Sequence, residues 1–255
     1  MNRIGVVGAS GRTGSHVIEA LVASTTSKLQ GAFVSTGSSR LGEVVGATGV
    51  AYWSDLERLA DCDGAIDFSV PSTTVQVARL CAEFKKPLVV GTTGLSVEEM
   101  KIVEACSKQV PVCVAPNTSL AATALKMAAR YLQDILGPSF DIEVMEIHHR
   151  MKKDAPSGTA LNLISGLSTS KESVVFGRQA IRHAGEVGVV SLRGGDVPGD
   201  HTVYFLGNGE RIELTQRAQN RGVFGTGAVV LIERLLKKPA GLYLVEDLLE
   251  ATPVG

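Results

Sequence analysis

The first 119 residues alternate short apolar segments with amphipathic ones, and this alternation restricts the fold more than any other feature. The expected strands cover residues 3–7, 29–35, 64–68, 87–90 and 110–115, and the expected helices include residues 55–60, 71–84 and 96–106. Short apolar strands separated by helices are typical of a doubly wound parallel sheet. In such sheets ligands bind beyond the carboxyl ends of the strands.

A glycine-rich loop follows the first expected strand. Gly8, Gly11 and Gly14 have the spacing G-x-x-G-x-x-G and precede an amphipathic helix. Glycines here let the backbone turn tightly and approach a pyrophosphate, whose charge a helix N-terminus stabilises. A plain turn is the alternative, but the position favours a Rossmann-like dinucleotide site. The candidate contacts in this loop are Gly8, Ala9, Ser10, Gly11, Arg12 and Thr13.

The end of the second expected strand bears on which nucleotide binds. In NAD-binding sheets an acidic residue near this end holds the ribose hydroxyls. Residues 34–40 read V-S-T-G-S-S-R and contain no carboxylate. Hydroxyls such as that of Ser35, together with Arg12 and Arg40, suit a 2′-phosphate, so we expect NADPH, with NADH as the alternative. A merely flexible loop is the other interpretation of this segment.

Three further polar loops follow expected strands, at residues 68–71, 91–94 and 115–119. Each alone is consistent with a simple turn. Because the carboxyl ends of parallel strands lie at the same edge of a sheet, together they predict one ligand-binding edge.

The pattern changes after residue 119. A helix rich in alanine and leucine at 120–136 precedes alternating segments at 142–148, 186–192, 201–206 and 211–216, with the hairpin signal Asn208-Gly209 before the last. Residues 221–237 return to a helical pattern. We therefore expect an inserted α+β domain with a mixed or antiparallel sheet at 120–219, for substrate binding. Residues 1–119 and 220–255 would form the dinucleotide-binding domain.

Chemically active side chains are densest in residues 146–161, E-I-H-H-R-M-K-K-D-A-P-S-G-T-A-L. His148 and His149 end an alternating strand, so they should face opposite ways. Ser157 after a proline predicts a helix N-cap with free N–H groups. Imidazoles and Lys152 beside a helix N-terminus suit anion binding and proton transfer. A solvated basic loop is the alternative. A metal site is disfavoured, because no other His or Cys stands at ligand spacing.

Composition excludes several other classes of protein. The formal net charge of −1 gives no bias toward nucleic acid. No apolar run has the length of a membrane span, and the N-terminus resembles a strand rather than a signal peptide. Four scattered cysteines without a C-x-x-C motif predict buried free thiols, as in a cytoplasmic protein.

The run E-x-H-H-x-x-K-x-D-A-P-S-G-T-A resembles the signature of the dihydrodipicolinate reductase family. The segments G-A-S-G-R-T-G, I-D-F-S-x-P, G-T-T-G, A-P-N-x-S, G-D-H-T-V-x-F and G-E-R-I-E-L-T follow the family order, so the resemblance spans almost the whole chain. It implies NAD(P)H-dependent reduction of 4-hydroxy-2,3,4,5-tetrahydrodipicolinate, a small dicarboxylate of lysine and diaminopimelate biosynthesis. It also implies a homotetramer that associates through the sheets of the 120–219 domain, which would thus serve both substrate binding and oligomerisation.

The same resemblance assigns roles to individual residues. His148 is implied as a proton donor or acceptor and Lys152 as a proton donor, with no decision between them. The implied substrate contacts are His149, Gly158, Thr159 and Thr93. The implied nucleotide contacts beyond the first loop are Ser35, Phe68, Gly91, Thr92, Thr93, Ala115, Pro116, Asn117, Thr118, Arg221 and Phe224.

Departures from the family pattern bear on nucleotide preference. Val34 stands near a position where some members have an acidic residue, and Val70 where some have arginine. Two other functions fit the dinucleotide-binding half alone: a different small NAD(P)-dependent dehydrogenase, and a nucleotide sensor without catalysis. The central motif disfavours both, because neither uses its histidines and lysine.

Overall fold

The computed structural model describes residues 1–167 and 173–249, and the chain divides into two compact units. The first unit comprises Met1–Leu120 and Arg221–Gly255, and the second Ala121–Asn220. Each division falls one residue after the boundary expected from the sequence. The last six residues of the expected 220–255 segment lie outside the described residues.

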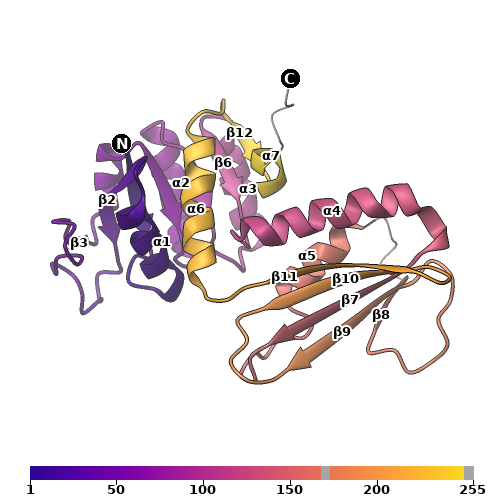
Figure 1. Cartoon of the computed structure of the whole chain (residues 1–255). Coiled ribbons are helices and arrows are strands. Elements are labelled where there is room, and N and C mark those ends of the chain that lie inside the picture. The colour runs from indigo at the N-terminus through magenta and orange to yellow at the C-terminus, as the bar shows by residue number, and fades with distance from the viewer. Residues whose placement is uncertain (168–172, 250–255) are drawn as a thin grey trace. The chain divides into compact units, whose positions relative to one another are not determined.

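The first unit contains a seven-stranded sheet in which every strand pairing is parallel. The strand order is β12-β6-β5-β4-β1-β2-β3 (Figure 1). The Rossmann-like prediction is therefore confirmed. The strands are β1 (Asn2–Val7), β2 (Ser27–Phe33), β3 (Tyr52–Trp53), β4 (Gly64–Asp67), β5 (Leu88–Val90), β6 (Pro111–Val114) and β12 (Gly241–Tyr243).

Helices cover both faces of this sheet, as side-chain alternation in the strands requires. Val6 packs in the cluster that contains the buried residues of α1 and α6, whereas Val7 packs with those of α2 and α3. The expected capping box is present at Ser96 and Glu99. The helices are α1 (Arg12–Ala23), α2 (Pro71–Glu83), α3 (Val97–Ser107), α6 (Gly222–Leu235) and α7 (Val245–Leu249).

Two predictions of helix extent were wrong in detail. Residues 55–60 were expected as a helix, but Leu56–Asp61 form a 3₁₀ helix that Asp55 caps. The helix expected over 221–237 ends at Leu235.

Small residues in α6 set how closely that helix packs in the first unit. A Cβ at Gly225 would overlap the carbonyl oxygen of His16 in α1, and one at Gly227 would overlap the carbonyl oxygen of Thr118. Thr118 in turn donates its hydroxyl to the carbonyl of Phe224 at 2.7 Å. The loop after β6 is therefore held against the first turn of α6, although these segments are about a hundred residues apart.

The second unit contains a five-stranded mixed sheet in the order β11-β10-β7-β9-β8, with α4 and α5 on one side of it (Figure 1). β7 pairs antiparallel with β10 and parallel with β9. The hairpin expected at Asn208-Gly209 joins β10 to β11. The elements are α4 (Leu120–Leu136), η2 (Gly137–Ser139), β7 (Asp141–His148), α5 (Gly158–Gly166), β8 (Val174–Phe176), β9 (Val187–Arg193), β10 (Asp200–Leu206) and β11 (Arg211–Arg217).

The core of the second unit lies between one face of this sheet and the two helices. Ile142, Val144, Val203 and Phe205 are buried there with residues of α4 and α5. The register places Glu146 opposite His201 of β10. The same face of β7 that buries Ile142 and Val144 in the core buries the polar side chains of Glu146 and His148 at the carboxyl end of the strand.

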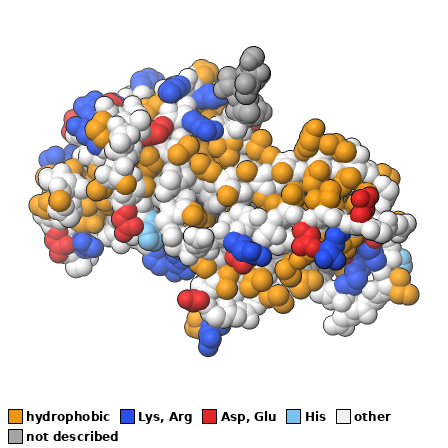
Figure 2. All heavy atoms as spheres, in the orientation of Figure 1, with side chains coloured by type: hydrophobic (Ala, Val, Ile, Leu, Met, Phe, Trp, Pro, Cys, Tyr) orange, Lys and Arg blue, Asp and Glu red, His pale blue; other side chains and the backbone are white. Residues whose placement is uncertain are grey.

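The surface is mixed in character. Basic, acidic and hydrophobic side chains are interspersed on the face drawn in Figure 2, in keeping with the small net charge. In the part of the chain that the structure describes, no helix is both long and apolar enough to cross a membrane. The four cysteines are free and buried, as predicted.

Candidate functional site

A polar cavity of about 400 Å³ lies at the carboxyl ends of the strands in the first unit. It is built by the start of α1, the loops after β4, β5 and β6, and the first turn of α6. The parallel topology explains this convergence, since all these loops leave the sheet at the same edge. Its lining residues are Arg12, Thr13, Phe68, Ser69, Gly91, Thr92, Thr93, Pro116, Asn117, Thr118 and Phe224.

Ten of the expected nucleotide contacts line this cavity, and seven do not. Gly8, Ala9, Ser10 and Gly11 form the loop that leads to its edge, and Gly8 has the positive φ of 74° that favours glycine. The remaining three lie elsewhere. Ser35 is exposed after β2, Ala115 is buried at the end of β6, and Arg221 is the exposed residue before α6.

Asp67, which was not predicted as a site residue, organises the floor of the cavity. Its side chain is fully buried and accepts hydrogen bonds from the hydroxyls of Ser69 (2.5 Å), Thr74 (2.5 Å) and Thr92 (3.0 Å). Burial raises the pKa of Asp67 against the effect of these donors. The carboxyl group thereby joins the loops after β4 and β5. A lone apolar-flanked aspartate gave no sequence signal for this role.

The residues at the cavity fit the diphosphate of a dinucleotide. None of its lining residues is acidic, whereas hydroxyls, an amide and the guanidinium of Arg12 are present. The first turn of α1 carries no acidic residue, and its N-cap, Gly11, offers no side-chain acceptor to the N–H groups there. Uncapped N–H groups at a helix N-terminus favour an anion.

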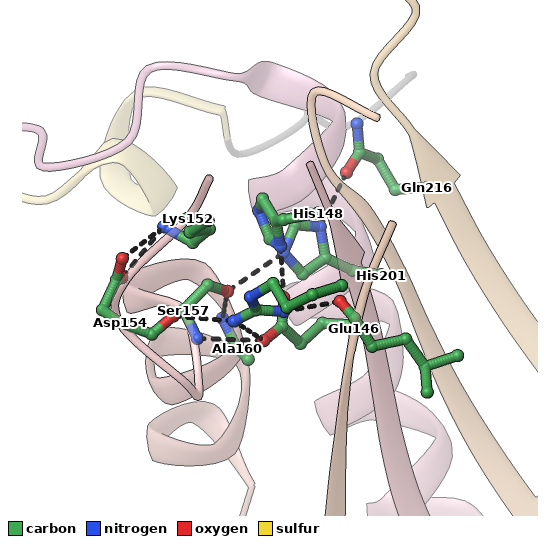
Figure 3. Close-up of polar contacts among 10 residues, drawn as sticks. Glu146, His148, Lys152, Asp154, Ser157, Ala160, His201 and Gln216 are labelled. Carbon is green, nitrogen blue, oxygen red and sulfur yellow. Dashed lines mark hydrogen bonds and ion pairs between the residues drawn. The ribbon is translucent and has the colours of Figure 1, made fainter. Parts of the chain in front are cut away.

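A second polar cluster lies at the carboxyl end of β7 in the second unit (Figure 3). Glu146 and His148 stand two residues apart and therefore share the buried face of the strand. The Glu146 side chain is fully buried and that of His148 is 8 % exposed. His148 Nδ1 is hydrogen-bonded to Glu146 Oε2.

The other carboxylate oxygen of Glu146 accepts two more hydrogen bonds. Arg193 Nη2 lies at 2.8 Å and the backbone N–H of Ser157 at 3.2 Å. Burial opposes ionisation of Glu146, but side-chain donors led by Arg193, together with the charge of His148, lower its pKa overall. A carboxylate with these donors is charged at neutral pH.

His148 has opposing influences on its protonation. Burial lowers its pKa, Glu146 raises it, and the nearby charges of Lys152 and Arg193 lower it, so that the net shift is downward. The imidazole is therefore mostly neutral at neutral pH, but it can be charged there more readily than burial alone would allow.

His201 of β10 stands against His148, with the two rings in edge contact at 5.2 Å between centroids. His201 Nδ1 lies 3.3 Å from Gln216 Oε1, and Nε2 lies 3.4 Å from the hydroxyl of Ser157 (Figure 3). Burial lowers the pKa of His201 to about 4, so this ring is neutral in the folded protein at pH 7.

The turn between β7 and α5 carries the remaining predicted residues. Ser157 is the expected N-cap and accepts a hydrogen bond from the N–H of Ala160 at 3.1 Å, which places Gly158 and Thr159 in the first turn of α5. Lys152 Nζ binds the carboxylate of Asp154. His149 is half-buried just beyond β7, and its N–H donates to the carbonyl of Val197 at 2.8 Å.

Glu146, His148 and His201 also stand close enough to hold a metal ion, with ligand atoms within 4.8 Å of one another. The sequence had given no sign that a second histidine joins His148. Each of these side chains, however, is already hydrogen-bonded to protein groups, and the guanidinium of Arg193 occupies the Glu146 carboxylate. The arrangement thus favours a proton-transfer network over a metal centre.

Thr93 belongs to the cavity of the first unit, while the other predicted substrate contacts belong to the second. Sequence reasoning missed Glu146, Arg193 and His201. The period-two spacing of Glu146 and His148 could have indicated the first. The other two depend on strand register, which pairs His148 with Arg193 and Glu146 with His201.

Comparison with known families covers nearly the whole chain. The model of the N-terminal part of dihydrodipicolinate reductase matches residues 2–118, and that of the C-terminal part matches residues 118–249. The 4-hydroxy-tetrahydrodipicolinate reductase of Myxococcus xanthus (strain DK1622) is 40% identical, over 98% of both chains. That of Aquifex aeolicus (strain VF5) is 43% identical, over 97% of this chain and 98% of the relative.

Solved structures show the same fold. The dipicolinate-bound dihydrodipicolinate reductase from Paenisporosarcina sp. TG-14 has a TM-score of 0.82 at 21% identity, over 98% of this chain and all of that one. A scyllo-inositol dehydrogenase from Lactobacillus casei with bound NAD(H) has a TM-score of 0.62 at 13% identity, over 97% and 93% of the two chains.

Proposed function

The chain belongs to the dihydrodipicolinate reductase family, and from that premise we propose how its residues carry out the family's reaction. The protein is an oxidoreductase of lysine and diaminopimelate biosynthesis. It reduces 4-hydroxy-2,3,4,5-tetrahydrodipicolinate to tetrahydrodipicolinate with a nicotinamide nucleotide. The proposed roles of the residues rest on one observation, the buried Glu146–His148 pair beside Lys152 and the N-terminus of α5.

The nucleotide is assigned to the cavity of the first unit. Backbone N–H groups of the loop from Gly8 to Thr13 would hold its diphosphate, and the loops after β5 and β6 would hold the remainder. When bound, it supplies the hydride for the reduction.

NADPH is the preferred nucleotide in this proposal, and NADH is the alternative. Residues 34–40 contain no carboxylate for ribose hydroxyls. Arg40 donates to Glu43 at 3.1 Å and stacks 5.0 Å from the ring centroid of Tyr52. A guanidinium positioned in this way, with Arg12 and the hydroxyl of Ser35, suits the additional phosphate of NADPH.

The dicarboxylate substrate is assigned to the turn between β7 and α5. The backbone N–H groups of Gly158 and Thr159 lie in the first turn of α5 and suit one carboxylate, because helix N-termini bind anions. Lys152 and His149 add positive charge or hydrogen-bond donors on the same turn. Thr93 is proposed as an additional contact from the cavity of the first unit.

His148 and Lys152 are proposed as the proton-transferring groups. Loss of the 4-hydroxyl group as water leaves an electron-poor ring. Addition of hydride to this ring leaves negative charge on the substrate, and an acid must neutralise it. General-acid assistance of this kind contributes about 10²- to 10⁴-fold in rate. The Lys152 ammonium and the imidazole of His148, which Glu146 makes easier to protonate, lie on one short segment of the chain and can act in sequence.

We further propose a homotetramer in the cytoplasm. The sheet face of the second unit that lies away from α4 and α5 carries Val190 and Leu192, which are 40% and 44% exposed. Association through this face would cover them. Leu192→Glu should then lower the mass measured by analytical ultracentrifugation, whereas an unchanged tetramer would place the interface elsewhere. The four free thiols support a reducing compartment.

A coupled assay tests the activity. The product of the preceding synthase reaction is supplied with NADPH, and the absorbance of the reduced nucleotide is followed. We expect oxidation only when both substrate and enzyme are present, and loss of oxidation in His148→Gln. A nucleotide sensor without catalysis would bind NADPH in the same preparation but leave it reduced.

A further inference from the structure

We propose that Glu146 is a positioning residue for the reaction: its buried carboxylate selects the tautomer of His148 and links this imidazole to the N-terminus of α5. The inference rests on the proposed function in one respect, which is that His148 transfers a proton. The choice of tautomer follows from the geometry of the second unit alone.

The tautomer is determined by which groups can donate. An ionised carboxylate can only accept hydrogen bonds, so the imidazole nitrogen that faces it must carry a hydrogen. Because Glu146 Oε2 faces His148 Nδ1, the neutral ring is the Nδ1–H form. Its lone pair is then on Nε2, and Nε2 is where a transferable proton binds and leaves.

The Nε2 side of His148 lies against the backbone of Gly199. A Cβ at Gly199, in the turn before β10, would lie 2.9 Å from His148 Nε2 and 3.4 Å from His201 Cε1. Glycine is the residue that leaves both imidazoles their present positions. The Nδ1 side is thus closed by Glu146, and the Nε2 side is kept free of side-chain atoms of residue 199.

Arg193 keeps Glu146 ionised, so that this side chain only accepts hydrogen bonds. Arg193 also binds the neighbouring turn. Besides its bond to Glu146 Oε1, Arg193 Nη2 donates to the carbonyl of Asp154 at 2.7 Å. Glu146 Oε1 also accepts the N–H of Ser157, the N-cap of α5. One carboxylate oxygen of Glu146 therefore holds the imidazole of His148, and the other holds the N-terminus of α5.

The charged and titratable groups around His148 come from three strands and one turn. They are Glu146 on β7, His201 on β10, Arg193 on β9, and Lys152 on the turn after β7. Of these, Glu146 alone is an anion, and it is the group that raises the pKa of His148 while Lys152 and Arg193 lower it. His201 is neutral at pH 7, since its pKa is about 4.

Substitution by glutamine makes a sharp prediction, because its two amide atoms are not equivalent. Arg193 and the Ser157 N–H are both donors, so the amide oxygen of the new side chain would stay toward them. Its NH₂ group would then face His148 and donate to Nδ1. In Glu146→Gln the tautomer therefore reverses to Nε2–H, although the shape of the side chain and the α5 contact are retained.

The experiment combines nitrogen-15 NMR of the histidine rings with steady-state kinetics on the full-length chain. We expect His148 to be the Nδ1–H form in the wild type and the Nε2–H form in Glu146→Gln, with a lower pKa. We expect kcat to fall at least about 10-fold, because without the Glu146 anion less of the ring is the imidazolium that donates from Nε2, and a neutral Nε2–H ring is too weak an acid to replace it. KM for the dicarboxylate should change less than about 3-fold, because Ser157 keeps its acceptor. The alkaline limb of the pH–rate profile should move to lower pH.

Two variants separate positioning from mere support of the fold. Glu146→Asp keeps a carboxylate, so it should restore the Nδ1–H form and part of the lost turnover. Val144→Ala removes a buried side chain on the same face of β7 and should lower the melting temperature without moving the tautomer or the pH profile.

The proposal is overturned if His148 keeps the same tautomer in the wild type and in Glu146→Gln, or if Val144→Ala reproduces the kinetic changes. Failure of the proposed function would look different. The wild type would then lack reductase activity, whereas the ring nitrogen spectra would still report whether Glu146 selects the tautomer.

Discussion

Lys152 Nζ lies 2.9 Å from each carboxylate oxygen of Asp154, two residues further along the turn between β7 and α5. The lysine side chain is 20% exposed and that of Asp154 is 59% exposed. The bond to Lys152 lowers the pKa of Asp154. An ion pair this exposed contributes little to stability, so its role is to orient the ammonium rather than to hold the fold.

Lys152→Ala is therefore expected to reduce activity with little effect on folding. Turnover should fall by about 10²- to 10⁴-fold, as expected for removal of a general acid. The melting temperature should change by no more than about 2 °C, because the lost pair is solvent-exposed. Lys153→Ala, at the exposed neighbouring position, is the control and should retain wild-type kinetics. Near wild-type turnover in Lys152→Ala would exclude it as the proton donor.

His149→Ala should affect binding rather than turnover. The side chain of His149 is half-buried beyond the end of β7, where its backbone N–H donates to the carbonyl of Val197 and its carbonyl accepts from the N–H of Lys152. A residue that contacts the substrate equally in ground and transition states raises KM when removed and leaves kcat unchanged. We expect KM for the dicarboxylate to rise about 10-fold. If kcat collapsed at constant KM, His149 and not His148 would be the acid.

Much of this structure could be predicted because its signals are local. The apolar alternation predicted the parallel sheet, and Ser157 after a proline predicted the start of α5. The same alternation predicted that His148 and His149 face opposite sides of the strand. These features depend on residues a few positions apart, where strand and helix periods are visible in the sequence.

The remainder of the site depends on pairings across the fold. His201 reaches His148 only because β10 runs antiparallel to β7 in a register that pairs it with Glu146. Arg193 reaches Glu146 because β9 runs parallel to β7 on its other side. Nothing within either segment specifies this register, so the buried network could not be assembled from spacing. Asp67 was missed for a related reason, since its partner Thr92 belongs to another loop.

Arg40→Ala tests the preference for NADPH. If the guanidinium binds the 2′-phosphate, its loss should raise KM for NADPH about 10-fold or more and change KM for NADH little. Glu43→Gln is the matched control: it removes the 3.1 Å partner of Arg40 but leaves the guanidinium in place. A wild-type KM for NADH well below that for NADPH would show that the preference is the reverse.

His201 should make the stability of the protein depend on pH. Its side chain is buried, and its pKa of about 4 in the folded state lies below the ordinary 6.5. Between these values the unfolded chain binds a proton that the folded chain does not. The stabilisation is therefore complete above pH 6.5 and is lost as the pH falls toward 4, by about 2–3 kcal/mol from this residue.

Urea denaturation of the wild type and His201→Gln at pH 7 and pH 4.5 measures this contribution. Glutamine can still accept from Ser157 and donate to Gln216, so the variant should fold and should lose less stability on acidification than the wild type. His16→Gln replaces a histidine on α1 whose side chain is 30% exposed, and it should behave like the wild type. Equal losses in the wild type and His201→Gln would mean that folding does not lower the pKa of His201. The ring would then be charged in the folded protein at pH 4.5, and its role there as a neutral acceptor for the hydroxyl of Ser157 would be wrong.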